Sequence, residues 1–459
     1  MSNNTSTETS SETITWIKNP LAIFTANDED ATAGIVIQGN QIIELVAKDT
    51  TPKNHIDEVF DASEHVVLPG LINVHHHFYQ TLTRAYPAAL NKRLFPWLKT
   101  LYPVWSGLKN EQLEMASLLA MSELMLSGCT TASDHHYVFT DGLENAIDIQ
   151  FAAAKSLGMR VHLTRGSMSL GVEQGGLPPQ NTVQDEQTIL DDSLRLIRTQ
   201  HDPSDGAMQR IALAPCSPFS VTEDLMKESA KLAAEHDVLL HTHLAETEDE
   251  NNFCLRMFGL RPLDYLDKVN WMNNRVWLAH GIHFTDEEVQ RLGQAEVGIS
   301  HCPSSNMLLA SGICRTLELE AAGSPIGIGV DGSASNDGSN MIAEVRQALL
   351  IGRLRYQADE VTHYDVFRWA TKGSAGCLRR DDIGEIAVGK QADLALFKLD
   401  ELRFSGAGDP LAALVLCGAQ KVDRLMIAGE WRVIDGELIG MDLQYLMQVH
   451  RAKAANLQN

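Results

Sequence analysis

The stretch Val66-Val67-Leu68-Pro69-Gly70-Leu71-Ile72-Asn73-Val74-His75-His76-His77 decides how this chain folds. Its apolar part predicts a strand buried on both faces, because parallel strands covered on each side by helices lose the polar alternation of half-exposed strands. Residues two apart in a strand share a face, so His75 and His77 should point one way and His76 the other. Neutral imidazole is the commonest metal ligand, so this pair predicts half of a metal site. A pair that serves only packing is the alternative at this point.

The middle of the chain alternates strand-like and helix-like segments, which is the pattern of parallel βαβ units. Helix-like segments separate the strands, for example 112–127 and 222–235. Together with the opening strand, eight strands are expected, and the other seven span 130–134, 160–164, 211–214, 238–243, 276–280, 297–301 and 325–331. Eight such units predict an α/β fold, a (β/α)8 TIM barrel with its active site at the carboxyl ends of the strands. An open doubly wound sheet is the rival, but polar residues follow nearly every strand, which favours the barrel.

Both ends of the chain are rich in strand signals. Gly39-Asn40 separates two apolar runs, which is a hairpin signature. We therefore predict a small β-sandwich domain built from residues 14–67 plus 384–459, around a barrel domain of residues 68–383. Residues 1–13 are rich in Ser, Thr, Asn and Glu, lack the basic and apolar regions of a signal peptide, and are expected to form a disordered tail.

Composition narrows the class of partner. The formal net charge of −23 argues against a nucleic-acid polymer or an anionic membrane as partner, and it leaves room for a small base-like molecule. The seven cysteines are scattered without a Cys-x-x-Cys motif, which argues against a disulfide framework and favours the cytoplasm. No apolar run reaches the length needed to span a bilayer.

Several predicted strands end in residues that bind metals or move protons. These strand ends carry His75, His77, His243, His280 and Asp331. In a closed barrel they converge on one mouth. A catalytic zinc ion keeps a few N and O ligands and one water, whose pKa it lowers from 15.7 to about 7. Glu246 lies three residues past His243, where a carboxylate that is not a ligand could shuttle protons.

Four motifs together resemble the signatures of the amidohydrolase superfamily, and in particular of its cytosine/guanine deaminase and chlorohydrolase branch. They are 69–77, His243-Leu244-Ala245-Glu246, Ala279-His280 and Gly329-Val330-Asp331. The segment 389–394 resembles the one that returns the family's chain to its sheet domain. The resemblance extends from residue 15 to the end of the chain.

This resemblance implies a zinc-dependent hydrolase with one divalent metal ion, held by His75, His77, His243 and Asp331. It further implies that Glu246 passes a proton to a ring nitrogen of the substrate. His280, together with Asp331, would activate the water and shuttle its protons. Members of the branch form dimers or larger assemblies, so a homo-oligomer is expected.

Two details sharpen the expected metal site. Relatives with two metal ions need a carboxylated lysine at the end of the fourth strand, where this chain has Ala214-Pro215-Cys216-Ser217-Pro218, so a mononuclear site is expected. His241 shares a face with His243, but the His-x-x-Glu spacing fits His243. We therefore assign His241 to the barrel interior.

The loop 78–108 is long and rich in aromatic residues, which could stack on a flat heterocycle, and Trp105 is expected to contact the substrate. Gln80 stands where purine-deaminating relatives place an amide that contacts the ring edge. Cys216 stands where guanine deaminases have an arginine, which argues against guanine itself.

Segments 75–85, 214–220, 301–307 and 331–340 most resemble the 8-oxoguanine deaminase group. The expected reaction is hydrolysis of the free base 8-oxoguanine at C2 to urate and ammonia. The alternatives are a triazine aminohydrolase or chlorohydrolase, or a deaminase of guanine, isoguanine or S-adenosylhomocysteine. A catalytically dead scaffold is a third possibility, which the presence of every expected ligand argues against.

Overall fold

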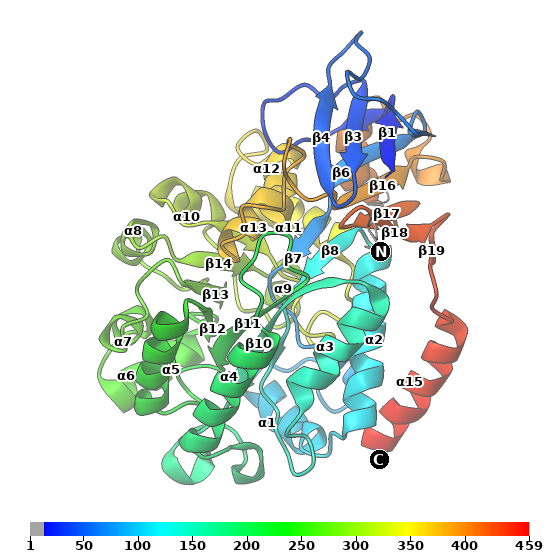
Figure 1. Cartoon of the computed structure of the whole chain (residues 1–459). Helices are drawn as coiled ribbons and strands as arrows, with labels where there is room; N and C mark the ends of the chain where they lie inside the picture. The colour runs from blue at the N-terminus through cyan, green and yellow to red at the C-terminus, as the bar shows by residue number, and fades with distance from the viewer. Residues whose placement is uncertain (1–12, 459) are drawn as a thin grey trace, which may run out of the picture.

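Eight parallel strands close into a barrel at the centre of the molecule (Figure 1). The structure is a computed structural model that describes residues 13–458, so the predicted tail, apart from Thr13, lies outside the described residues. The barrel strands are β7 (Leu71–Asn73), β8 (Cys129–Ala132), β10 (Arg160–Ser167), β11 (Gln209–Pro215), β12 (Leu239–Leu244), β13 (Val276–His280), β14 (Gly298–His301) and β15 (Ile326–Ile328). Pairing of β10 with β11 closes the ring, and the predicted TIM barrel is confirmed.

Helices follow the barrel strands, and most of them cover the outside of the ring. They are α1 (Leu94–Trp105), α2 (Asn110–Leu126), α3 (Ala146–Leu157), α4 (Glu186–Gln200), α5 (Glu223–His236), α6 (Glu248–Phe258), α7 (Pro262–Lys268), α8 (Asp286–Gln294), α9 (Pro303–Leu308), α10 (Thr316–Ala322), α11 (Met341–Arg355), α12 (His363–Arg368) and α13 (Ser374–Cys377). Hydroxyl side chains fix where several of them begin. Thr222 caps α5 by accepting from the Leu225 N–H, and Thr247 caps α6 by accepting from the Glu250 N–H.

The opening stretch does not form one strand. Residues His65–Pro69 form β6, which pairs antiparallel with β16 (Leu394–Lys398) outside the barrel, and the barrel strand β7 begins only after Gly70. A Cβ atom at Gly70 would lie 2.1 Å from Thr130 Oγ1, so only glycine allows the chain to pass this close to β8. His75, His76 and His77 then follow β7 in irregular backbone, not within the strand itself.

Two sheets from the chain ends pack beside the barrel (Figure 1). The first contains β1 (Ile14–Lys18), β3 (Gly34–Gln38), β4 (Gln41–Val46) and β5 (Glu58–Asp61), and β3 and β4 form the predicted hairpin. The second joins β2 (Ala22–Ile23) and β6 to β16, β17 (Arg424–Ile427), β18 (Glu430–Ile434) and β19 (Glu437–Leu438). Ile35 and Ile37 of the first sheet share one apolar cluster with Leu394 of the second. The exact domain boundaries stay a prediction.

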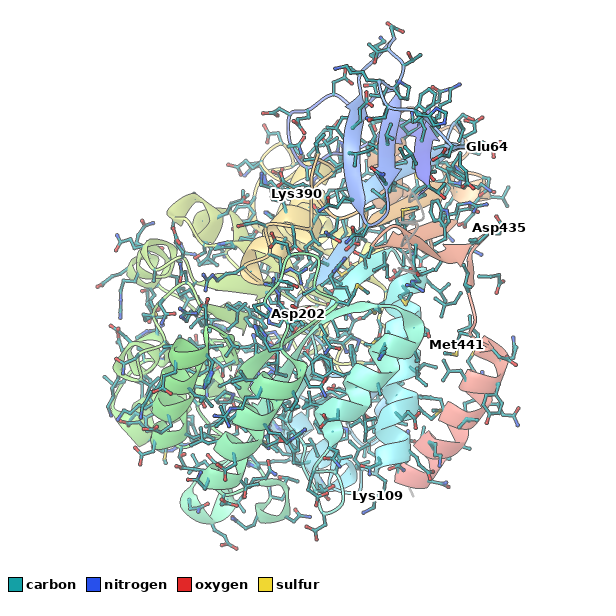
Figure 2. The ribbon with its side chains drawn as sticks, in the orientation of Figure 1. Glu64, Lys109, Asp202, Lys390, Asp435 and Met441 are labelled. Atoms are coloured by element: carbon teal, nitrogen blue, oxygen red, sulfur yellow. The ribbon has the colours of Figure 1, made fainter. Side chains whose placement is uncertain are left out.

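The last helix returns to the barrel. The chain leaves β19 near Met441 and forms α15 (Leu443–Gln458), which runs alongside α2 (Figures 1 and 2). His450 Nε2 lies 3.1 Å from Thr81 Oγ1, and Gln112 Nε2 donates to the Lys453 carbonyl oxygen. This segment therefore packs on the barrel, although the prediction placed it in the small domain. Among residues 13–458, no helix combines the length and apolar character needed to cross a membrane.

Candidate active site

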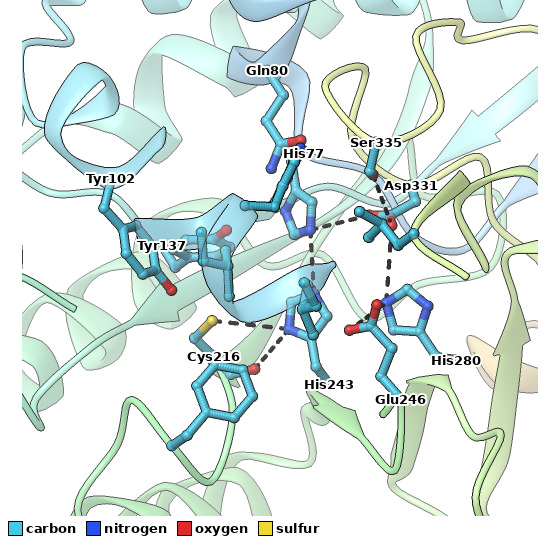
Figure 3. A pocket seen from close by; sticks show the side chains of 15 residues that line it. His77, Gln80, Tyr102, Tyr137, Cys216, His243, Glu246, His280, Asp331 and Ser335 are labelled. Carbon is cyan, nitrogen blue, oxygen red and sulfur yellow. Dashed lines mark hydrogen bonds and ion pairs between the residues drawn. The ribbon is translucent and has the colours of Figure 1, made fainter. Parts of the chain in front are cut away.

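The residues predicted from strand ends meet at the carboxyl end of the barrel (Figure 3). His243 lies on β12, His280 ends β13, and Asp331 follows β15. His75 and His77 reach the same place from the segment after β7. All five side chains are buried, with at most 8% of the surface of any residue exposed.

Three imidazoles and one carboxylate surround a single point. His75 Nε2 and His77 Nε2 each lie 3.3 Å from Asp331 Oδ1, and His243 Nε2 lies 3.2 Å from His77 Nε2. Two ligands about 2.0–2.2 Å from a tetrahedral zinc ion are about 3.3 Å apart, so these separations match the edges of a zinc coordination shell. The ligand atoms of His75, His77 and His243 lie within 4.8 Å of one another.

Hydrogen bonds orient two of the imidazoles for metal binding. His77 Nδ1 donates to the His135 carbonyl oxygen and His243 Nδ1 to the Cys216 carbonyl oxygen, both at 2.7 Å. A carbonyl oxygen only accepts, so when both rings are neutral their protons lie on Nδ1 and two Nε2 lone pairs face each other. Lone pairs in this arrangement repel unless a cation lies between them. The residues therefore fit a divalent metal ion.

Charges at this centre favour a cation. Burial alone raises the pKa of Asp331, but interaction with His75 and His77 outweighs burial and holds that pKa well below its usual value. Burial alone lowers the pKa of His77, yet the Asp331 carboxylate brings a net upward shift. Burial lowers the pKa of His243 to about 3, so this imidazole stays neutral and keeps its lone pair.

Glu246 and His280 form a pair beside the metal ligands (Figure 3). His280 Nε2 lies 3.6 Å from Glu246 Oε2 and 3.9 Å from Asp331 Oδ2. Burial, opposed by the nearby His280, raises the pKa of Glu246 above its usual value. Ser311 Oγ donates to Glu246 Oε1 at 3.3 Å. A carboxyl group with a raised pKa next to an imidazole can exchange protons near neutral pH.

The backbone is strained at the same residues. His280 and Asp331 have φ angles of 74° and 62°, and Ala245, next to Glu246, has a φ of 54°. These values lie in the left-handed region, which costs non-glycine residues free energy and is concentrated at functional sites. The strain turns these side chains out of their strand ends and toward the common centre.

A cavity that is partly open to solvent lies beside the predicted metal ligands. Its far wall is apolar and aromatic, formed by Leu94, Trp97, Leu98, Tyr102, Phe219 and Leu309. Tyr102 is 1% exposed, and neither its hydroxyl nor Gln80 Oε1 has a hydrogen-bond partner among the described residues. A Cβ atom at Gly332 would lie 1.9 Å from Gln80 Oε1, so glycine leaves room for this amide.

The three residues predicted to contact the substrate take different positions relative to the cavity. Gln80 and Cys216 line the cavity, but Trp105 does not. Its indole N–H donates to Thr83 Oγ1 at 3.1 Å, and its ring packs against Trp97 and Tyr79, one layer behind the wall. Trp105 is therefore not among the residues that line the cavity, and its contact with the substrate stays a prediction. Trp97 and Tyr102, from the same aromatic segment, line the cavity instead.

Three other lining residues were not predicted individually from the sequence. Tyr137, Leu309 and Ser335 line the cavity from three different loops. Ser335 Oγ donates to Asp331 Oδ2 at 3.2 Å. Asn306 lies behind them, with its side-chain oxygen 2.9 Å from His280 Nδ1. No periodicity or spacing marks such loop residues individually, although Asn306 and Ser335 lie in the segments 301–307 and 331–340 that carry the family resemblance.

The amidohydrolase family model matches residues 66–432, which include every predicted site residue. The chain belongs to the amidohydrolase family. The predicted family and the prediction of an enzyme are therefore confirmed. Family membership also agrees with the arrangement of histidines and an aspartate at the carboxyl end of a TIM barrel.

Three proteins to which this chain is similar show which activities occur among its relatives. The 8-oxoguanine deaminase of Pseudomonas aeruginosa is 63% identical over 96% of this chain and 99% of its own length. The hydroxydechloroatrazine ethylaminohydrolase of a Pseudomonas species is 37% identical, over 84% of this chain and 81% of its own length. A crystal structure of the atrazine chlorohydrolase from Arthrobacter aurescens, complexed with zinc, superposes with a TM-score of 0.90 at 30% identity, covering 97% of this chain and 100% of that one.

Proposed function

We propose that this protein is a metal-dependent aminohydrolase that converts free 8-oxoguanine and water to urate and ammonia. The observation that carries this proposal is the 63% identity to an 8-oxoguanine deaminase along nearly the whole chain. The convergence of His75, His77, His243 and Asp331 beside Glu246 and His280 supports it independently. The aromatic side chains of Trp97, Tyr102 and Phe219 in the cavity wall suit a flat base.

We assign the cofactor as a single divalent ion, zinc in the first place, held by His75, His77, His243 and Asp331. The 3.2–3.3 Å separations between their ligand atoms support a shared centre. No lysine stands at the end of β11, where a second ion would need a bridging group. When bound, the ion supplies an activated water near neutral pH, since it lowers the pKa of water to about 7.

The chain's own residues would move the protons. His280, between the Glu246 and Asp331 carboxylates, is placed to accept a proton from the attacking water and pass it on. Glu246, whose pKa burial raises, would donate a proton to the ring nitrogen next to C2. The new C–O bond would form at C2, the bond from C2 to the exocyclic nitrogen would break, and ammonia would leave with the proton relayed by His280. The remaining proton of the attacking water would return to Glu246, so that C2 becomes a carbonyl and Glu246 regains its proton.

The substrate would bind against the wall opposite the metal ligands. Gln80 offers a donor and an acceptor to a lactam-like edge of the base, and its oxygen has no partner within the described protein. Tyr102 presents an unpartnered hydroxyl from the same wall. Cys216 leaves an uncharged surface where an arginine would fill part of the cavity. A location in the cytoplasm and a homo-oligomeric state stay predictions.

Ammonia release, together with chromatographic detection of the products, including ethylamine from an ethylamino-substituted hydroxytriazine, tests the proposal with purified, zinc-loaded protein. The panel comprises 8-oxoguanine, guanine, isoguanine, cytosine, S-adenosylhomocysteine and a hydroxytriazine. We expect the highest kcat/KM on 8-oxoguanine, with urate as product. The similarity to an atrazine chlorohydrolase and to an ethylaminohydrolase makes triazine hydrolysis the second candidate. Turnover of the hydroxytriazine above that of every purine would favour it and contradict the main proposal.

A further inference from the structure

The proposed metal ligand His75 differs from the other two ligand histidines, His77 and His243, in the hydrogen-bond partner of its Nδ1 atom. His77 and His243 each donate Nδ1–H directly to a backbone carbonyl oxygen. His75 Nδ1 instead lies 2.8 Å from the Nε2 of another histidine, His241. His241 is fully buried on β12, two residues before His243, and the mechanism above gives it no part.

The hydrogen bonds of His241 fix where each proton lies. His241 Nδ1 is 2.8 Å from the carbonyl oxygen of Trp277, which only accepts, so His241 Nδ1 carries the proton. A neutral imidazole has one N–H, so His241 Nε2 is left with a lone pair and must accept from His75 Nδ1. His75 Nε2 then carries its own lone pair and faces Asp331 Oδ1 at 3.3 Å.

We propose that His241 is a positioning residue that holds His75 in the tautomer and orientation needed to bind the metal. The relay His75–His241–Trp277 takes the place of the direct bond to a carbonyl that His77 and His243 make. A stacked indole keeps the intermediate ring in place, because the rings of His241 and Trp277 lie 4.4 Å apart at 17°. This inference rests on the metal site of the proposed function.

A second metal ion is the competing explanation of the same histidines. The ring nitrogens of His75, His135 and His241 also lie within 4.8 Å of one another. However, two nitrogens bound to one tetrahedral zinc ion are about 3.3 Å apart. The separation of 2.8 Å between His75 Nδ1 and His241 Nε2 is that of a hydrogen bond, so the geometry favours the relay.

Zinc affinity, measured by competition with a chromophoric chelator, tests the relay without any substrate. His241→Phe keeps a flat ring on Trp277 but removes the acceptor, and we expect it to weaken zinc binding about 10- to 100-fold. In His241→Gln the amide oxygen can accept from His75 while its NH2 group donates to Trp277, so affinity should return close to that of the unmodified protein. His162→Phe is the matched control, because His162 is buried near Trp277 and neither of its ring nitrogens has a partner in the described protein.

The possible results of these experiments either support or overturn the relay. Unchanged affinity in His241→Phe, or equal losses in the Phe and Gln variants, would overturn the relay. So would two zinc ions per unmodified chain with one lost in His241→Phe. If His241→Phe does not fold, neutron diffraction of the unmodified protein tests the relay instead. It should show deuterium on Nδ1 of both His75 and His241. Deuterium on His241 Nε2 would contradict the proposal. A protein that binds zinc but leaves 8-oxoguanine untouched would contradict the proposed substrate and leave the relay standing.

Discussion

The two halves of the cavity differ in how their polar atoms are satisfied. In the metal half, formed by His75, His77, His243, Glu246, His280 and Asp331, the distal ring nitrogens are held by carbonyls or other side chains of the protein. His75 Nε2, which has no hydrogen-bond partner among the described residues, faces the proposed position of the metal ion. In the aromatic half, formed by Gln80, Trp97, Tyr102 and Phe219, the Tyr102 hydroxyl and Gln80 Oε1 have no partner in the described protein. The metal half is complete before substrate arrives, whereas the aromatic half leaves groups free to bind one.

This difference separates the residues that carry out the reaction from the residues that select the substrate. A preorganised centre costs no reorganisation at the moment of reaction, so changes in the metal half should act on kcat. Unpartnered polar groups in a buried wall gain their hydrogen bonds only when a substrate arrives. Changes in the aromatic half should therefore act on kcat/KM and on the choice among substrates.

Glu246→Gln should have the largest effect. Gln keeps the shape of the side chain but cannot act as a proton shuttle, so we expect kcat to fall about 100- to 10,000-fold. Zinc content should not change, because Glu246 is not a ligand. Steady-state ammonia release and metal analysis measure both. Glu248→Gln, an exposed acid two residues away, is the control and should keep full activity. Normal turnover in Glu246→Gln would remove this residue from the mechanism.

Gln80→Leu should have the second-largest effect on activity. It replaces the amide by an apolar side chain of similar size, so the base loses its edge contact at a cost of about 1–3 kcal/mol, or roughly 5- to 150-fold in kcat/KM. Zinc affinity should be unaffected. Kinetics on 8-oxoguanine and on the hydroxytriazine measure the change in preference. An equal loss on every compound in the panel would mean that Gln80 supports the cavity without selecting the substrate.

Tyr102→Phe should lower activity by less than Gln80→Leu does, and it should leave stability equal or higher. The loss of one neutral hydrogen bond to substrate lowers kcat/KM by about 1 kcal/mol, or roughly fivefold. In the free protein the same change removes a buried hydroxyl without a partner, so the free energy of unfolding should stay equal or rise. Thermal unfolding with and without substrate measures both. A clear loss of stability would show that the hydroxyl already has a partner in the free protein.

Trp105→Phe should affect activity least. Its indole N–H contacts Thr83 and its ring packs behind the cavity wall, so the change removes a buried hydrogen bond at a cost of about 0.5–1.5 kcal/mol of unfolding free energy. The ratio of kcat/KM values between 8-oxoguanine and guanine should stay the same. A shift in that ratio would support the original prediction that Trp105 contacts the substrate.

The metal half could be predicted from the sequence because strand position and residue chemistry coincide there. His243, His280 and Asp331 each end or follow an apolar strand, and a barrel brings all its strand ends together. His241 was assigned to the barrel interior by its spacing from Glu246, and it is buried there. Its hydrogen bond to His75 joins residues 166 positions apart and depends on ring orientations, which spacing does not encode.

The aromatic half and the chain ends were harder to predict for physical reasons. Aromatic content marks a helix as apolar but does not say which side of it meets the cavity, so Trp105 was favoured over Tyr102. The split of the opening stretch at Gly70 was missed because both parts are apolar, and only the close approach to Thr130 requires glycine there. The helix α15 was missed because its docking depends on distant partners such as Thr81.

A crystal structure of zinc-loaded Glu246→Gln with 8-oxoguanine tests the two-half account most directly. We predict one anomalous zinc peak among His75, His77, His243 and Asp331. The base should lie in the cavity with one polar edge on Gln80 and with C2 facing His280. A zinc ion bound among His75, His135 and His241 would contradict the account. So would a base held on the metal side that leaves Gln80 and Tyr102 without partners.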